Sequence, residues 1–370
     1  MTARPVAQLG RRILIFWWPV IALAAIVVAA SSLSSTDGPF LQDTAVTDLV
    51  YLLFVLGLYV FAGNSGVFSF GHIAFAAIGA YAAGIFAIPV ATKAQLFSSM
   101  PSALVHLHTS SLVATLIGGG VAAFAGLLTS IPLMRLNGLA ASLATFALLI
   151  IVHVVAQNLN QVTNGQSAMT GVPTTTTKTE MIVWCLLGIA VAYLFQQSTW
   201  GLRLRASRED AVAARASGIS VYFERRAAWI LSTFYMGIGG ALYGQFLGTF
   251  SPDAFYLDIT FLIIAMLVIG GTTSLAGAVI GSVFVSVASE LLRRLELGPH
   301  IGPLHIPGRP GVQAVGLALI MLLTLLLRPG GIAGGREIHW PLNRLLPRPV
   351  VSTASEVEVG RPARTDAAAE

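Results

Sequence analysis

Long apolar runs dominate this chain and alternate with short polar stretches. Seven runs are long enough to cross a membrane as helices, at about 13–32, 46–62, 111–133, 138–157, 181–197, 228–250 and 312–328. Shorter or glycine-interrupted runs lie at about 71–88, 259–271 and 275–292. The pattern predicts an all-α fold, a polytopic integral membrane helix bundle of about ten membrane segments that include broken or re-entrant helices.

The composition agrees with a membrane protein and argues against several other classes. Hydrophobic residues make up 55% of the 370 residues, and charged residues make up only 10%. The net charge of +5 comes mainly from arginines beside apolar runs, where they set membrane topology, so we expect no nucleic-acid partner. Cys185 is the single cysteine, so the chain has neither an intramolecular disulfide nor a thiolate zinc cluster, and we expect no metal site.

The distribution of positive charge predicts the orientation of the bundle. Ten crossings place both termini on one side, which then carries all but five of the 21 lysine and arginine residues. The positive-inside rule makes the termini and the polar loop 198–227 cytoplasmic. A re-entrant segment at 63–88 would remove one crossing and reverse half of this assignment.

Three regions follow from this pattern. Residues 1–45 form an N-terminal segment with the first transmembrane helix, because the apolar run after Arg12 is longer than the core of a typical signal peptide. Residues 46–334 form the main membrane domain. Residues 335–370 are rich in Pro, Ala, Ser and charge, which predicts a disordered cytoplasmic tail.

The polar loop 198–227 contains six arginines and the pattern of a short capped helix. Ser207 suits the N-cap, and Asp210 follows three residues later as in a capping box. Glu209 and Asp210 complement the positive end of the helix dipole, and Gly218 suits the position just after the helix. A membrane protein with a separate helix in a loop is expected to present that helix to a partner.

Glycines at four-residue spacing predict close helix contacts, since membrane helices pack through small residues. Gly240, Gly244 and Gly248 repeat along the run at 228–250, and Gly277 and Gly281 do so in the run at 275–292. Packing within this chain is the favoured interpretation. A subunit interface or a moving seam is the alternative.

The spans lack the groups that ion-driven carriers commonly use. Asp48 and Glu290 lie near the ends of apolar runs, so a proton relay is poorly supported, although a sodium carrier that uses backbone carbonyls stays open. The two lysines, Lys93 and Lys178, do not stand in a P-loop motif. If transport is fuelled by ATP, a separate subunit must hydrolyse it.

Several ordered blocks over about 46–334 resemble one family. Residues 63–81 read GNSGVFSFGHIAFAAIGAY, similar to the signature of LivM-type permeases, the membrane subunits of ABC importers for branched-chain amino acids. Ala140 and Thr272-Thr273 depart from the family pattern and put details of the translocation pathway in doubt. Further similar blocks lie at 135–139, 163–173, 200–210, 251–252 and 270–277.

The resemblance implies an ABC importer permease domain at 46–334 with a coupling helix in the loop 198–227. Its surface would dock on an ATPase, with Asp210, Ala213, Ala214 and Ser217 on one face. Arg208 and Arg215 would pair with acidic residues of that ATPase. An ordinary solvated loop helix is the alternative. The coupling residues expected are Arg208, Glu209, Asp210, Ala213, Ala214, Arg215, Ser217 and Gly218.

The family also implies the partners and the location. They are a second, LivH-like permease, two LivG/LivF-like ATPases that bind ATP and Mg²⁺, an extracytoplasmic substrate-binding protein, and membrane lipid in the bacterial inner membrane. This chain would bind no cofactor and catalyse no reaction. The stretches 89–110, 158–180 and 293–311 are the candidate docking surface for the binding protein.

The block at 63–81 also predicts where substrate passes. Glycines interrupt a span beside polar groups, a pattern that marks broken helices lining a pathway, and freed main-chain groups there would bind an amino acid. Tight packing with interhelical hydrogen bonds is the alternative. Relatives carry branched-chain or other amino acids, amides or urea, while an ion-coupled transporter or channel remains the competing function. The candidate pathway residues are Asn64, Ser65, Ser69, His72 and Thr145.

Overall fold

The computed structural model describes residues 4–33, 39–97, 100–297, 300–301, 304–305, 311–328 and 330–337. Its long helices are α1 (Arg4–Leu33), α2 (Pro39–Leu58), α3 (His72–Ala87), α6 (Ser111–Leu133), α7 (Gly138–Asn158), α9 (Lys178–Gln197), α12 (Val221–Leu247), α13 (Leu257–Gly270), α14 (Leu275–Glu296) and α15 (Val312–Leu327). Short elements join them: the π-helix η1 (Tyr59–Gly63), α4 (Val90–Leu96), α5 (Ser102–Val105), α8 (Asn160–Thr163), α10 (Thr199–Glu209), α11 (Ala211–Ala216), the 3₁₀ turn η2 (Pro252–Phe255) and strands β1 (His300–Ile301) and β2 (Leu304–His305).

Every predicted apolar run coincides with one of these long helices, which confirms the polytopic all-α fold. Six helical stretches of the described chain are long and apolar enough to span a membrane: Asp43–Gly63, Ser111–Leu133, Gly138–Asn158, Lys178–Gln197, Pro252–Gly270 and Leu275–Glu296. The pair α3 and α4 makes a seventh only if counted together, and its two parts are bent by 111°. Shorter apolar helices cover 16–32 and 312–327.

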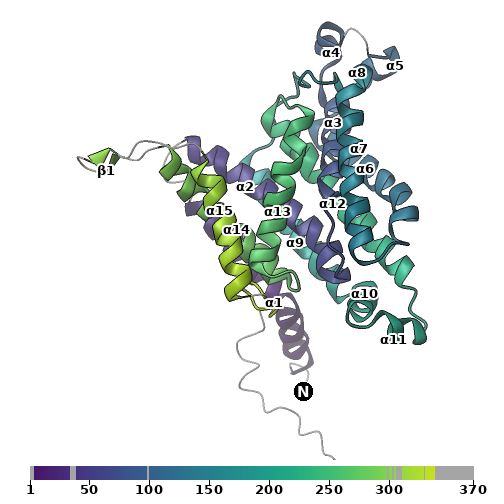
Figure 1. Cartoon of the computed structure of the whole chain (residues 1–370), viewed down its shortest axis with the longest axis vertical. Coiled ribbons are helices and arrows are strands. Elements are labelled where there is room, and N and C mark those ends of the chain that lie inside the picture. Colours follow the sequence, from purple (N-terminus) through teal and green to yellow (C-terminus); the bar gives the residue numbers. More distant parts are fainter. Residues whose placement is uncertain are drawn as a thin grey trace, which may run out of the picture. The chain divides into compact units, whose positions relative to one another are not determined.

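Successive long helices run in opposite directions between two ends of the bundle. At one end, called the α11 end, Arg225 at the start of α12 contacts Asn137 just before α7, with Nη1 and Oδ1 2.7 Å apart. At the opposite end, called the α4 end, the amide of Thr109 before α6 donates to Phe86 O near the end of α3 at 2.9 Å. Helices α10 and α11 lie together beyond the bundle at one end, and α4, α5 and α8 lie at the other (Figure 1).

The region 63–88 crosses the full bundle rather than turning back. Gly66 lies against the side chain of Arg208 at the α11 end, and residues 66–71 are non-helical. This segment returns along α7, where Ser142 Oγ donates to Phe68 O at 2.8 Å and Phe70 N donates to Thr145 Oγ1 at 3.2 Å. Helix α3 completes the crossing to the α4 end, so the crossing consists of an extended part followed by a helix.

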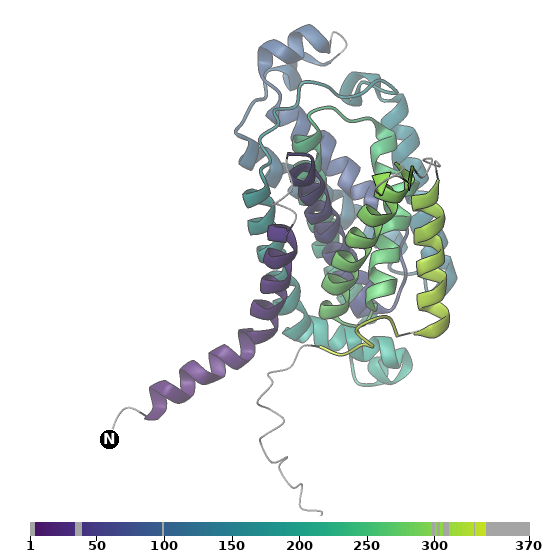
Figure 2. The ribbon, with the colours of Figure 1, turned by 90° about the vertical axis from the view of Figure 1, so that its left-hand side faces the viewer.

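Helix α12 forms the centre of the bundle because glycines let its backbone approach its neighbours. It packs on α3 and α6, and Trp229 near its start is fully buried. A Cβ at Gly237 would lie 2.4 Å from Ala122 Cβ, and one at Gly79 would lie 2.3 Å from Gly237 O. Such distances leave no space for a side chain, so these positions require glycine. Figure 2 shows the long helices side by side in the bundle, except for the N-terminal part of α1, which extends away from it.

The predicted tail at 335–370 lies almost wholly outside the described residues. Residues 330–337 continue from α15 and pack below α13 and α14. Ile332 N and Ala333 N donate to Ile269 O and Gly270 O at 2.8 and 3.0 Å. The main unit therefore reaches at least to Glu337.

Candidate functional site

The polar loop folds into two short helices with defined caps. Ser198 caps α10 by accepting a hydrogen bond from Gly201 N at 3.2 Å. Asp210 caps α11, and its Oδ1 accepts from Val212 N at 2.8 Å and Ala213 N at 3.0 Å. These bonds, the Ala213 amide first, hold the pKa of Asp210 below its ordinary value.

The end of α11 is a Schellman motif built on Gly218. Gly218 has a φ of 80°, a conformation that favours glycine. Its amide donates to Arg215 O at 3.0 Å, and the amide of Ile219 donates to Ala214 O at 3.0 Å. The sequence placed Gly218 correctly just past this helix.

The predicted N-cap was wrong. Ser207 lies inside α10, is buried and donates to Leu204 O at 2.7 Å. Because α10 starts at Thr199 and buries Leu204, the chain continues helically past Ser207 and breaks only at Asp210. Glu209 consequently ends α10, so it does not lie at the positive end of a helix dipole as predicted.

The outward surface of α11 includes part of the predicted docking face. Asp210, Ala213 and Ser217 are exposed, whereas Ala214 is only 6% exposed and packs against the bundle. The prediction that Ala214 shares the docking face is therefore wrong for this structure. Val212, which the sequence analysis passed over, is 69% exposed on the same helix.

Arg208 points inward, not toward a partner. Its Nη1 donates to Gly63 O at 2.7 Å, and Gly63 is the last residue of the π-helix η1. The helix ends at Ser65, so the Gly63 carbonyl lies in its last turn and is one that the interrupted helix leaves in need of a donor. Arg208 thus joins α10 directly to the broken span.

The candidate pathway residues are buried and mostly bonded to nearby groups. Asn64 Nδ2 donates to Val60 O at 3.1 Å, and Ser65 Oγ accepts from Val67 N at 3.2 Å. Ser69 Oγ lies 2.7 Å from His72 Nδ1. Thr145 Oγ1 donates to Ser142 O at 2.8 Å while accepting from the extended segment.

Two polar atoms of this group have no hydrogen-bond partner in the described part of the chain. They are Asn64 Oδ1 and His72 Nε2, both buried. The His72 ring lies 4.7 Å from the Trp229 ring and 5.5 Å from the Phe61 ring, between centroids. Ser65 lines an open cleft. A pathway role for the group stays a prediction.

A cleft of about 730 Å³ opens between the broken span, the start of α7 and the helices α10 and α11. Three arginines line it, and we call it the arginine cleft. Its lining residues are Ala62, Ser65, Gly66, Val67, Phe68, Asn137, Gly138, Leu139, Ser142, Ser207, Arg208, Ala211, Arg215, Arg225 and Thr272.

The predicted glycine positions lie at close contacts within this chain. A Cβ at Gly240 would lie 2.0 Å from Ala76 O of α3, one at Gly244 2.8 Å from the Phe250 ring, and one at Gly281 2.2 Å from Met266 O of α13. A Cβ at Gly277 would lie 2.5 Å from Gly271 O. Gly248 differs from the prediction, because it follows α12 with a φ of 67° and ends the helix, although a Cβ there would also lie 2.7 Å from Thr174 Cγ2.

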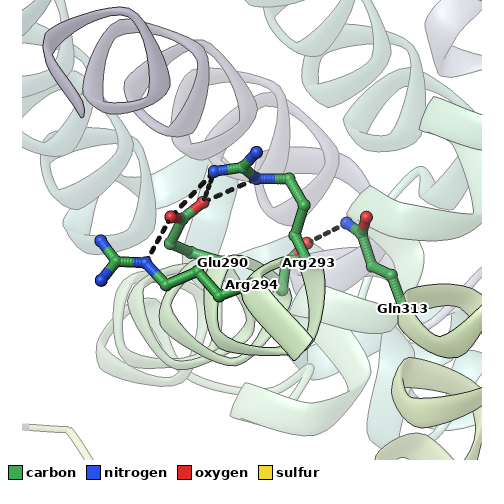
Figure 3. Close-up of polar contacts among 5 residues, drawn as sticks. Glu290, Arg293, Arg294 and Gln313 are labelled. Atoms are coloured by element: carbon green, nitrogen blue, oxygen red, sulfur yellow. Dashed lines mark hydrogen bonds and ion pairs between the residues drawn. The ribbon is translucent and has the colours of Figure 1, made fainter. Parts of the chain in front are cut away.

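The α4 end carries a separate polar network. Glu290 on α14 accepts from Arg293 Nε and Arg294 Nε, each at 2.9 Å. Gln313 at the start of α15 donates to Ser289 Oγ at 2.6 Å. Figure 3 shows both arginines folded back onto the one carboxylate, so this network offsets part of the positive charge at the α4 end.

An unpredicted contact joins the end of the main unit to the α11 end. Glu337 Oε1 accepts from Gln196 Nε2 and from Leu275 N, both at 2.8 Å. Arg205 Nη2 in turn donates to Gln196 O at 2.8 Å. Glu337 caps α14 from 62 residues away in the chain, so no local sequence pattern signals it.

A family model bears directly on this arrangement. The model described as "Branched-chain amino acid transport system / permease component" matches residues 40–327, most of the chain. The chain belongs to this permease family. The LivM-type resemblance is thereby confirmed, and the matched range takes in the broken span, α10, α11 and the arginine cleft.

Curated relatives of this permease-family chain agree. The high-affinity branched-chain amino acid transport system permease protein LivM of Escherichia coli is 25% identical over 286 residues, covering 68% of this chain and 63% of LivM. The probable branched-chain amino acid transport permease protein LivH of Methanocaldococcus jannaschii is 32% identical over 162 residues, covering 44% of this chain and 48% of LivH. The chain therefore spans less than two thirds of the length of LivM. Among solved structures, PsaBC from Streptococcus pneumoniae in complex with Fab aligns at 17% identity with a TM-score of 0.37. The alignment covers 86% of this chain and 100% of the other. This similarity is too low to indicate a shared function.

Proposed function

We propose that this chain is a transmembrane permease subunit of an ATP-driven ABC importer that carries branched-chain or other amino acids, or related small amides or urea, into the cytoplasm. Membership of a permease-component family supports this function. The chain has no P-loop, so ATP and Mg²⁺ would be bound and used by separate ATPase subunits. A permease moves its substrate without breaking a covalent bond, so this chain needs no catalytic residue.

The observation that carries the proposal is the direct bond to the broken span from α10, which with α11 forms the proposed coupling helices. Helix α11 is fixed at both ends by caps and presents Asp210, Ala213 and Ser217 outward. Helix α10 directly precedes α11 and places Arg208 on Gly63 O. A displacement of α11 by a bound ATPase would therefore be transmitted to the helix break through α10 and the Arg208–Gly63 hydrogen bond.

The proposed partners are assigned to the two ends. Two LivG/LivF-like ATPases would bind at the α11 end, and an extracytoplasmic binding protein would dock at the α4 end over α4, α5 and α8. A second, LivH-like permease and membrane lipid would cover the exposed apolar sides, which include Leu139 at 76% and Phe124 at 62% exposure. We place the chain in the bacterial inner membrane, with its termini and α10–α11 in the cytoplasm, on the basis of the positive-inside rule.

Co-purification with the ATPase subunits tests this proposal. Ala213→Trp puts a large side chain on the exposed face of α11, and Gly218→Pro imposes a φ near −65° where the backbone has a φ of 80°. We expect both variants to insert into the membrane and to lose the ATPase. Ala103→Trp, on exposed α5 at the α4 end, is the matched control and retains it. ATPase recovery at the wild-type level with both α11 variants would refute the coupling role.

A further inference from the structure

The arginine cleft concentrates positive charge on one small concave surface. Arg208 and Arg215 reach it from α10 and α11, and Arg225 reaches it from α12. Its volume of about 730 Å³ lies within the range of about 300–1,000 Å³ that small-molecule sites occupy. Gathering like charges is unfavourable unless a ligand of opposite sign compensates them.

These arginines form no direct ion pair within the described part of the chain, although Arg215 lies close enough to Asp210 to help lower the pKa of that carboxyl. Among the residues that the structure describes, no carboxylate lies within ion-pair distance of Arg208, Arg215 or Arg225. The neighbouring Arg203, by contrast, lies outside the cleft lining and pairs with Glu224, with Nη1 and Oε1 3.5 Å apart. The three arginines that line the cleft are therefore available to form an ion pair with an external anion.

Arg225 has an unused donor in a buried position. The residue is only 9% exposed, and its Nη1 donates to Asn137 Oδ1 at 2.7 Å. Its Nε is buried without a hydrogen-bond partner in the described chain. A buried guanidinium N–H without an acceptor is costly, which indicates that an acceptor belongs beside it.

The position of the cleft indicates which anion it meets. One wall is the interrupted span at 62–68, and another contains Ser142, whose hydroxyl bonds to the extended segment at Phe68 O. The cleft therefore lies where the proposed pathway would reach the cytoplasm. Guanidinium groups bind carboxylates with paired, charge-assisted hydrogen bonds.

We propose that the arginine cleft binds the α-carboxylate of the transported amino acid at the inner end of the pathway. This inference rests on the proposed transport function, since it takes the cargo to be an amino acid. The Arg225 guanidinium supplies a donor from the buried side, and Arg215 closes over the ligand from α11. Arg208 also bonds to the broken span. Movement of α10 and α11 would therefore change the affinity of the cleft for the bound amino acid.

Ligand-observed NMR on the whole complex tests the assignment. The complex of both permeases and both ATPases is placed in phosphatidylcholine nanodiscs, without nucleotide or binding protein, and titrated with L-leucine and with L-leucinamide, which lacks the carboxylate. We expect L-leucine to bind and L-leucinamide to bind at least about tenfold more weakly, the effect of losing a charge-assisted hydrogen bond. Arg215→Gln, at an exposed position, and Arg225→Gln are each expected to weaken L-leucine binding about tenfold or more. Arg203→Gln leaves it unchanged.

Three results would overturn the inference. They are absence of L-leucine binding by the wild-type complex, equal binding of the amide, and unchanged binding by both cleft variants. An acidic ATPase side chain that already fills the cleft would give the first of these. Failure of the transport function is distinguishable, because then the subunits would not assemble or the reconstituted complex would not take up substrate with ATP. A complex that transports normally but binds no carboxylate in the cleft contradicts this inference alone.

Discussion

At the scale of single residues, Arg208 is the central contact of the molecule. Sequence reasoning assigned its charge to an ATPase, but its guanidinium instead satisfies the Gly63 carbonyl at the end of the π-helix. The side chain is half-buried and also packs on Gly66, which has a φ of 71° and no side chain to interfere. One residue thus joins the polar loop 198–227 to the broken span.

Removal of Arg208 is expected to cost both stability and coupling. Arg208→Ala leaves the Gly63 carbonyl without its charged donor, and a hydrogen bond to a charged group contributes about 1.5–3 kcal/mol. The matched variant Arg203→Ala removes a 3.5 Å ion pair with Glu224, in which the arginine side chain is 56% exposed and the glutamate side chain 11% exposed; a pair that involves an exposed group is worth about 0–1 kcal/mol. The melting temperature of the purified complex and the ratio of substrate transported to ATP hydrolysed should both be lower in the first variant. Equal values for the two variants would contradict this role of Arg208.

We predict that the stabilisation of α11 by the Asp210 cap weakens only at acidic pH, where the Asp210 carboxylate becomes protonated. Its folded pKa lies below the ordinary value of about 3.9. The stabilisation is therefore complete above the unfolded pKa and is lost as the pH falls through the folded pKa. Near neutral pH, Asp210→Ala should speed amide hydrogen exchange in 211–216, and Asp210→Asn should preserve protection because Asn also caps helices. Rapid exchange in both variants would show that a charge, rather than a cap acceptor, is needed.

At the scale of elements, the bundle depends on close backbone contacts between α12, α3 and α6. A span with several glycines has weak intrinsic helix preference, so tertiary packing must hold it. The same glycines allow the carbonyls of α3 to approach α12 within van der Waals distance. This contact fixes the start of α3, and with it the extended segment that precedes the helix.

The glycine contact yields a matched pair of substitutions. Gly240→Ala places a Cβ 2.0 Å from Ala76 O, whereas Gly120→Ala on α6 meets no heavy atom within 4 Å. Overpacking costs about 1–3 kcal/mol, while alanine at the open position gains about 0.5–1 kcal/mol through helix preference. Size-exclusion profiles and melting temperatures should show loss of folded protein in the first variant only. Similar melting temperatures would mean that α3 and α12 are free to move apart.

Most of the helices could be predicted from sequence, but their breaks could be predicted only in part. Apolar length determines a membrane helix, and glycines at 63, 66 and 71 correctly indicated an interruption. The cap of α11 was misplaced because Ser207 and Asp210 are both good N-caps. Only the burial of Leu204 and Ser207 in α10 decides between them. The Glu337 contact was missed because a long-range cap leaves no periodic signal.

At the scale of the whole molecule, alternating helix directions place α10 and α11 opposite α4, α5 and α8 (Figure 1). The described arginines of the loop 198–227 all lie at the α11 end, while Glu290 pairs with both arginines near the end of α14. Charge is therefore asymmetric between the ends, as the positive-inside rule requires of a membrane-inserted bundle.

Labelling of single cysteines tests this orientation. Cys185 is fully buried, so it should not react, and Ala103→Cys and Ala213→Cys place one accessible thiol at each end. An impermeant maleimide added to intact cells should label the Ala103 variant. The Ala213 variant should react only in inverted vesicles. Labelling of both from the same side would contradict an odd number of crossings between the two positions.

Uptake by reconstituted protein tests the central claim most directly. Proteoliposomes that hold the complete complex, with the binding protein outside and ATP and Mg²⁺ inside, should accumulate radiolabelled L-leucine. Liposomes that contain this chain alone, or the complex without ATP, should not accumulate it. Accumulation by this chain alone without ATP, driven by a sodium or proton gradient, would contradict the account and establish an ion-coupled carrier.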